Sequence, residues 1–321
     1  MDIIFKSILR DEIISFMEVV KLTVIDHKAY KRTLIDFDAF LHAEKLTEKK
    51  LDALQISRWL DGLDVHILTK KSKLSHIRRF SVFLATHGIG SSLPEMPRST
   101  TDFAPYVFTQ DEMTQIFEMA DDFVLTNPKS RAAVEFPMLL RLLYGCGLRL
   151  GEALSASWCD VDLLDGVITI KAAKNQKQRL VPMDEELIRI LRLYRALPYF
   201  EEDDKGLLFR QANGNPRPGN TFWDIFNRIL CELGIKNPQT AKHRARGPCL
   251  HSLRHTFTLQ SFLKADAEGK SFMETVPFVS TYLGHAGLMQ TDIYLKARHE
   301  LYTQAHKTIE DYTFDVFPEE V

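Results

Sequence analysis

Residues 88–105 interrupt the helical pattern of apolar side chains that runs along the rest of this chain. They are mainly glycine, serine, proline and threonine, which bury little surface and favour an extended linker. A chain of 321 residues also exceeds the size at which single hydrophobic cores usually stop growing. We therefore predict two domains, residues 1–90 and residues 105–321, joined by a linker at residues 91–104.

Apolar residues at helical spacing predict that the first domain is all helical. Thr47 and Thr69 are suitable N-terminal caps of two helices, and Gly62 and Gly88 are suitable stops. The predicted helices span residues 11–21, 26–43, 47–62 and 69–87. The last helix has a basic surface that suits contact with a phosphate backbone. The residues that we select on this surface are Lys71, Lys73, Arg78 and Arg79.

Helices also dominate the pattern after the linker. Thr109 and Glu112 make a capping box that opens the first of them. Further helices are predicted over residues 131–146, 151–157, 184–197, 219–233, 252–266, 272–283 and 298–311. Residues 166–183 differ, because apolar residues alternate with polar ones around a K-N-Q-K-Q turn, which predicts a hairpin or a three-stranded sheet. The expected fold class is mainly α with a small antiparallel β-sheet.

The net charge of −2 gives the chain no overall basic character, although duplex-binding surfaces are usually basic. Acidic residues are nevertheless absent between Asp165 and Asp184 and between Glu232 and Asp266. The charged residues inside these two segments are Lys171, Lys174, Lys177 and Arg179, then Lys236, Lys242, Arg244, Arg246, Arg254 and Lys264. This pattern indicates local basic surfaces, and chance clustering on a solvated face is the alternative.

The N-terminal sequence and the cysteines indicate where the protein works. Residues 1–20 alternate apolar and charged side chains, unlike a secretory signal, and no apolar run reaches membrane-spanning length. The four cysteines form no C-x-x-C pair and are too few for a disulfide framework. We expect a cytoplasmic protein with reduced cysteines and no zinc finger.

Four short stretches contain residues suited to phosphodiester chemistry. They are G-C-G-L-R-L-G-E with Arg149, K-N-Q-K-Q-R-L-V-P with Lys174, H-S-L-R-H-T-F with His251 and Arg254, and L-G-H-A-G-L-M-Q-T-D-I-Y ending at Tyr294. Each stretch alone has an ordinary structural explanation. Cleavage without a metal needs a nucleophile, cationic donors and an acid for the leaving oxygen. Arginine matches phosphate oxygens bidentately, so Arg149 and Arg254 suit a phosphate clamp.

In this order the four stretches resemble the tyrosine recombinase or phage integrase family, and the resemblance covers the whole chain. It implies an N-terminal helical core-binding domain of SAM-like fold and an α+β catalytic domain that together clamp DNA. It also implies an enzyme that breaks and rejoins duplex DNA through a 3′-phosphotyrosine intermediate, with no metal, ATP or other cofactor. Such an enzyme acts as an integrase, a transposon recombinase or a resolvase.

The resemblance assigns roles to individual residues. Tyr294 is the expected nucleophile, Arg149 and Arg254 the expected phosphate clamp, and Lys174 the expected acid for the leaving 5′ oxygen, with Lys177 as a competitor for that role.

Further residues have expected roles around this set. His251 assists proton transfer at the tyrosine, His285 donates to a non-bridging oxygen, and Glu152 and His255 support the site. Other DNA contacts are expected from Lys177, Arg179, Lys242, Arg244 and Arg246.

The implied partners are double-stranded DNA with paired recombination half-sites and further copies of the chain. We expect a homo-oligomer, with a dimer on one site and a tetramer when two sites are paired. The tail, residues 302–321, ends with the apolar Phe314, Val316 and Phe317, which suit docking onto a neighbouring protomer. Packing of the tail on its own domain is the alternative.

Three other functions remain open from the sequence. A type IB topoisomerase uses a similar set of residues on any duplex, and a DNA-binding accessory protein would keep the fold without catalysis. A metal hydrolase would use His251 and His255, but H-S-L-R-H lacks the glutamate of the zincin pattern and a third ligand is not evident.

Overall fold

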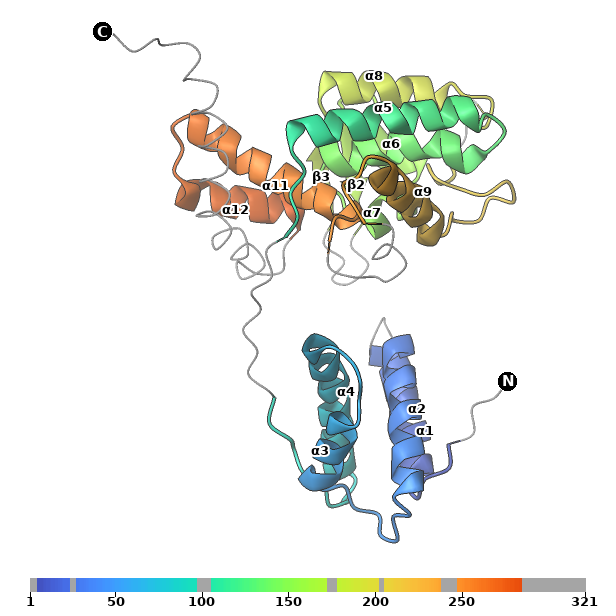
Figure 1. Cartoon of the computed structure of the whole chain (residues 1–321), viewed down its shortest axis with the longest axis vertical. Helices are drawn as coiled ribbons and strands as arrows, with labels where there is room; N and C mark the ends of the chain where they lie inside the picture. Colours follow the sequence, from blue (N-terminus) through green and yellow to red (C-terminus); the bar gives the residue numbers. More distant parts are fainter. Residues whose placement is uncertain are drawn as a thin grey trace. The chain divides into compact units, whose positions relative to one another are not determined.

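The computed structural model of the chain describes residues 5–23, 27–96, 105–171, 178–201, 205–237 and 247–284 (Figure 1). The chain divides into two compact units, Met1–Asp102 and Phe103–Val321, each with a hydrophobic core of its own. Helices dominate both units, and unit 2 contains a three-stranded antiparallel sheet. The predicted fold class is therefore confirmed. None of the described helices combines the length and the apolar character needed to cross a membrane.

Unit 1 contains four described helices. They are α1 (Arg10–Thr23), α2 (His27–Ala43), α3 (Ala53–Asp61) and α4 (Ile67–Thr86). Their apolar faces meet in one core, whose largest side chains include Phe16, Phe37, Trp59 and Phe80. Leu74, Ile77 and Leu84 of α4 are buried in this core, as their spacing predicts.

The predicted starts of α3 and α4 are wrong. Asp52 caps α3, because its side chain accepts the backbone N–H of Gln55 while the Gln55 side chain accepts that of Asp52. This reciprocal pair satisfies two backbone donors, which Thr47 cannot do from outside the helix. His66, not Thr69, caps α4. At the other end of α3, Gly62 is the C-terminal cap as predicted.

The chain after α4 returns along unit 1. The backbone N–H of Leu51 donates to the carbonyl oxygen of Gly90 at 2.9 Å, and that of Ser92 donates to the carbonyl oxygen of Leu51 at 2.8 Å. Arg78 donates from its guanidinium to the carbonyl oxygen of Pro94. The first part of the expected linker is thus hydrogen-bonded to unit 1.

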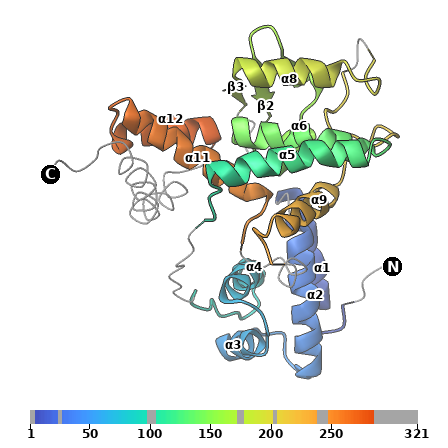
Figure 2. The same ribbon diagram turned by 45° about the horizontal axis from the view of Figure 1, so that its top comes forward.

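Unit 2 is built around helix α6. Its described helices are α5 (Gln110–Thr126), α6 (Arg131–Gly145), α7 (Leu150–Ser155), α8 (Glu185–Arg195), α9 (Gly219–Glu232), α11 (Leu250–Ala267) and α12 (Phe272–Leu283). Helix α6 packs against α5, α8, α9 and α11 (Figures 1 and 2). The Thr109–Glu112 capping box at the start of α5 is confirmed. The helix predicted over residues 298–311 lies outside the described residues.

The small sheet of unit 2 confirms the hairpin predicted over residues 166–183, and its third strand lies before that range. Its strands are β1 (Val161–Asp162), β2 (Val167–Ile170) and β3 (Arg179–Pro182), in the order β1-β2-β3. Alternation directs Ile168, Ile170 and Val181 into the core. Arg179 pairs with Ile170 at the end of the ladder. Register therefore places Arg179 beside the connection between β2 and β3, which contains Lys174.

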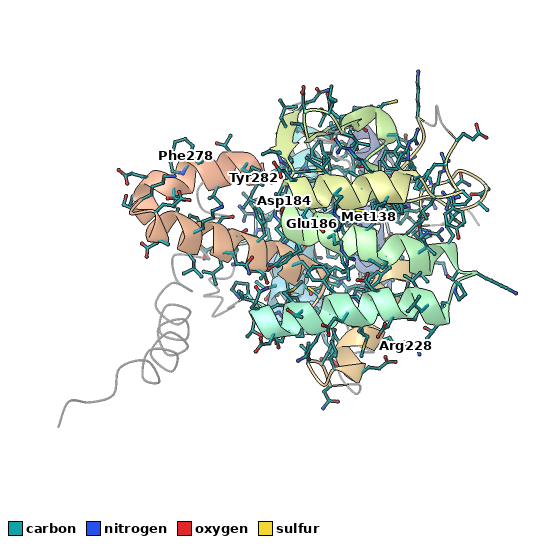
Figure 3. The ribbon with its side chains drawn as sticks, turned by 90° about the horizontal axis from the view of Figure 1, so that it is seen from above. Met138, Asp184, Glu186, Arg228, Phe278 and Tyr282 are labelled. Atoms are coloured by element: carbon teal, nitrogen blue, oxygen red, sulfur yellow. The ribbon has the colours of Figure 1, made fainter. Side chains whose placement is uncertain are left out.

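Helices α11 and α12 form a hairpin with a small core of its own, made by Phe262, Val276, Val279 and Leu283. Phe278 and Tyr282 both lie on α12 (Figure 3), where Phe278 is 77% exposed and Tyr282 stacks on Phe257. Gly284 ends α12 in the left-handed conformation. This C-terminal cap directly precedes His285 in the chain.

All four cysteines are free thiols, as predicted. Cys146 is buried in the core of unit 2, and Cys159 is exposed.

Candidate active site

The turn before α7 brings Arg149 to the surface of unit 2. Gly147 in this turn has a φ of 57°, which glycine adopts without the strain that a side chain adds. A Cβ atom here would come within 2.5 Å of the Phe257 ring. Glycine therefore lets α11, which contains Phe257, pack directly against the turn. Arg149 follows as the residue that precedes the first turn of α7.

Glu152 binds two arginines from different elements. Its Oε1 accepts from Nη1 of Arg149 at 2.9 Å and from Nη1 of Arg179 at 3.0 Å. Its Oε2 accepts from Nη2 of Arg179 at 2.8 Å and from the backbone N–H of Arg149 at 2.9 Å. Burial alone would raise the pKa of Glu152, but these hydrogen bonds and charges outweigh it and lower the pKa to about 2. The carboxylate is therefore ionised at neutral pH.

Arg254 lies on α11 and is only 2% exposed. Its Nη1 donates to the carbonyl oxygen of Gly147 and its Nη2 to the carbonyl oxygen of Leu283, both at 2.7 Å. Its Nη1 is also 3.9 Å from Oε2 of Glu152. A buried charge of this kind is stable only when hydrogen bonds and an opposite charge replace water. Arg254 thus joins the α7 turn, α11 and the end of α12.

The two predicted clamp arginines converge at the C-terminus of α12. Nη1 of Arg149 lies 3.4 Å from the carbonyl oxygen of Leu283, the same atom that Arg254 binds. Nη2 of Arg149 lies 3.5 Å from the carbonyl oxygen of Gly284. The negative end of the helix dipole favours cations at this position. Tertiary packing therefore brings together two guanidinium groups that are far apart in the sequence.

His251 lies in the first turn of α11, on the same helix as Arg254. The residue as a whole is exposed, but its ring packs edge-on against His255, with ring centroids 4.7 Å apart. Partial desolvation of the ring and the positive charges of Arg254 and Arg149 lower the pKa of His251, while Glu152 opposes them weakly. His251 is therefore neutral at pH 7 and able to accept a proton. Within the described residues, no three His, Cys, Asp or Glu side chains are grouped to hold a metal ion.

Comparison with known proteins agrees with this arrangement. Residues 106–300 match the phage integrase family over more than half of the chain. The chain belongs to the phage integrase family. Membership of this family makes it a tyrosine-type site-specific recombinase.

Individual members of the integrase family resemble the chain over most of its length. Tyrosine recombinase XerC of Chlorobaculum tepidum is 30% identical over 322 residues, which cover 87% of this chain and 88% of XerC. XerH site-specific recombinase, in a post-cleavage complex with palindromic difH DNA, has a similar fold, with a TM-score of 0.65 at 19% identity over 93% of this chain and 84% of XerH. A lambda integrase bound as a tetramer to a Holliday junction gives a TM-score of 0.57 at 15% identity, over 87% and 77% of the two chains.

Four of the predicted site residues lie together in one cluster of this integrase family member. They are Arg149, Glu152, His251 and Arg254. His255 lies beside His251. The remaining catalytic and loop predictions, Lys174, Lys177, Lys242, Arg244, Arg246, His285 and Tyr294, lie outside the described residues.

The predicted basic surface of α4 is partly engaged within unit 1. Lys73 forms an ion pair with Asp36, and Nη1 of Arg79 donates to the hydroxyl of Tyr30 at 2.9 Å. Lys71 lies on the same helix. DNA contacts by these residues stay predictions.

Two features of the site were not identified from the sequence. Arg179 was predicted to contact DNA, but its side chain is 14% exposed and its guanidinium binds Glu152. The carbonyl oxygen of Leu283 also had no predicted role. The sequence signal for both features was the glycines of G-C-G and L-G-H, because Gly147 and Gly284 both take a positive φ where the chain turns next to the cluster. The segment without acidic residues between Glu232 and Asp266 was predicted to form a basic surface, but two of its basic residues, Arg254 and Lys236, are buried.

Proposed function

We propose that the chain cuts and rejoins duplex DNA at specific sites through a 3′-phosphotyrosine link at Tyr294. The observation that carries this proposal is the approach of Arg149 and Arg254 to one atom, the carbonyl oxygen of Leu283, at 3.4 and 2.7 Å. Two guanidinium groups held this close supply the charge that a phosphate needs in the transition state. His285 follows this position almost directly in the chain, so the fourth motif begins at the cluster.

In the proposed step the phenol oxygen of Tyr294 forms a bond to phosphorus, and the bond between phosphorus and the 5′ oxygen breaks. The tyrosine proton passes to His251, and Lys174 gives a proton to the departing oxygen. Arg149 and Arg254 stabilise the charge on the non-bridging oxygens.

His285 adds a donor to a non-bridging oxygen in this scheme. The ester retains the energy of the broken phosphodiester bond, so the 5′ hydroxyl of a second strand reverses the step. The chain's own side chains therefore supply the nucleophile, the acid and the charge, and no nucleotide is consumed.

The proposal extends to partners. XerH is in a complex with difH DNA, and lambda integrase forms a tetramer on a Holliday junction. We assign to this chain duplex DNA with paired half-sites, held by residues 1–90 and 105–321 on either side of a linker, with a dimer on one site and a tetramer in synapsis. The apolar tail, residues 302–321, would join neighbouring protomers. We place this reaction in the cytoplasm.

The test first selects a binding site for the protein from a pool of random DNA duplexes. A nick is then placed in that site, so that the cleaved strand cannot be rejoined and the covalent intermediate accumulates. Wild-type protein should form a covalent protein–DNA adduct on denaturing gels, and Tyr294→Phe should form none. An adduct that persists in the variant, or none with wild type on a tightly bound site, would overturn the proposal. Equal relaxation of supercoiled DNA with and without the site would indicate a topoisomerase instead.

A further inference from the structure

Arg179 contacts the cluster formed by Arg149, Glu152 and Arg254, and its side chain is largely buried in unit 2. It extends from the first residue of β3. Both terminal nitrogens of its guanidinium bind Glu152, one to each carboxylate oxygen, at 3.0 and 2.8 Å. This fork-to-fork geometry is the strongest arrangement of an arginine and a carboxylate. Arg149 makes a single side-chain bond to the same carboxylate.

The difference between the two arginines has an electrostatic consequence. Glu152 lies beside Arg149, so its negative charge competes with a DNA phosphate for that guanidinium. An unpaired carboxylate here would also repel the phosphate itself. Because Arg179 takes both oxygens of Glu152, it neutralises most of this charge. Arg149 then retains its own charge for a phosphate.

Arg179 also borders the end of α12. A Cβ atom on Gly284 would lie 2.9 Å from Nη1 of Arg179, and Gly284 has a φ of 65°. The guanidinium cannot move aside cheaply, because Glu152 holds it through two bonds. Arg179 therefore fixes α7, β3 and the α12 cap relative to one another at the point where the chain continues to His285.

We propose that Arg179 is a positioning residue: it pairs with Glu152 so that Arg149 keeps its charge for the scissile phosphate, and it does not bind DNA itself. This inference rests on the proposed function. It replaces the expectation from the sequence that Arg179 contacts DNA.

The experiment compares Arg179→Gln, Glu152→Gln and the double variant on the nicked substrate, well below the unfolding temperature of each protein. Arg179→Gln should slow adduct formation by about 10- to 100-fold, the size of effect that follows when a group that orients a metal ligand is removed. Any loss of DNA affinity or of its salt dependence should come from the unpaired Glu152 carboxylate, so the double variant should recover both. Removing the uncompensated charge in the double variant should restore several-fold of the lost rate.

A direct DNA contact predicts a different set of results. Loss of a phosphate contact lowers the salt slope by about one, and Glu152→Gln then has no reason to restore the rate. A salt slope that stays lowered in the double variant, or a cleavage rate that Glu152→Gln does not restore, would overturn the inference. Arg189→Gln is the matched control, because Arg189 also binds a glutamate with two nitrogens but lies exposed on α8. Its cleavage rate should equal that of wild type.

Arg179→Lys keeps the test decisive if the glutamine variant fails to fold. Lysine binds a phosphate as a point charge but cannot make the two-bond pair with Glu152. The inference therefore expects slower cleavage by Arg179→Lys with an unchanged salt slope, whereas a direct contact expects nearly normal cleavage. Absence of any adduct with wild type would refute the proposed function, while a normal wild-type adduct without rescue would refute only the role of Arg179.

Discussion

Replacing Glu152 by glutamine should remove a pH-dependent part of the stability of unit 2. The carboxylate has a pKa of about 2 in the folded chain, against an ordinary value of 4.5. Each pKa unit corresponds to about 1.36 kcal/mol, so ionisation of Glu152 stabilises the folded state by about 3 kcal/mol at neutral pH. Because the folded pKa is the lower one, this stabilisation is complete above about pH 4.5 and is lost as the pH falls to about 2.

Urea-induced unfolding followed by tryptophan fluorescence measures this effect. Trp59 belongs to unit 1, whereas Trp158 and Trp223 belong to unit 2, so a Trp59→Phe background reports on unit 2 alone. We expect Glu152→Gln to lower the free energy of unfolding by about 3 kcal/mol at pH 7 and by roughly 1.4 kcal/mol at pH 3.

Glu186→Gln is the control for this measurement. Glu186 binds Arg189 three residues away, as Glu152 binds Arg149, but both side chains of the control pair are exposed. Exposed pairs contribute little, so this variant should unfold like the parent at every pH. A difference between Glu152→Gln and the parent that stays constant from pH 7 to pH 3 would refute the assigned pKa and the ion pairing behind it.

Three further outcomes follow from the structure. Gly147→Ala should destabilise unit 2 by about 1–3 kcal/mol, measured by the same unfolding assay, because it strains a positive φ and meets the Phe257 ring at 2.5 Å; unchanged stability would contradict that packing. The lowered pKa of His251 should place the midpoint of the acid limb of the cleavage rate below about pH 6.5, and His251→Gln should lose this limb in a pH profile measured on the nicked substrate. Asp52→Ala should destabilise unit 1 by about 1 kcal/mol, as thermal unfolding would show, whereas Thr47→Ala should not; equal effects would argue against the observed cap.

Local patterns account for the parts of the fold that were predicted correctly. Thr109 and Glu112 start a helix because the capping box needs only residues that are close in sequence. The failure at Thr47 has the same origin, since Asp52 offered a competing cap a few residues later. Which of two capable residues caps the helix depends on where packing against the core of unit 1 lets the helix begin.

The cluster around Glu152 could be predicted only in part. Phosphate chemistry was enough to select Arg149 and Arg254, whereas Glu152 and His251 were selected through the resemblance to the tyrosine recombinases. Periodicity was not enough to place Arg179. A basic residue after a turn has the same sequence pattern whether it faces solvent or a carboxylate, and the structure places Arg179 of β3 against Glu152.

The amino-acid order by itself determined the helices, the small sheet, the family and the side chains suited to react, because each depends on local spacing or on chemical type. Only the tertiary structure decided that one carboxylate is shared by Arg149 and Arg179, and that Arg149 and Arg254 meet at the end of α12. The physical reason is that ion pairing and desolvation depend on distances of a few ångströms between α7, β3, α11 and α12. Long-range packing sets those distances, and no local pattern encodes them.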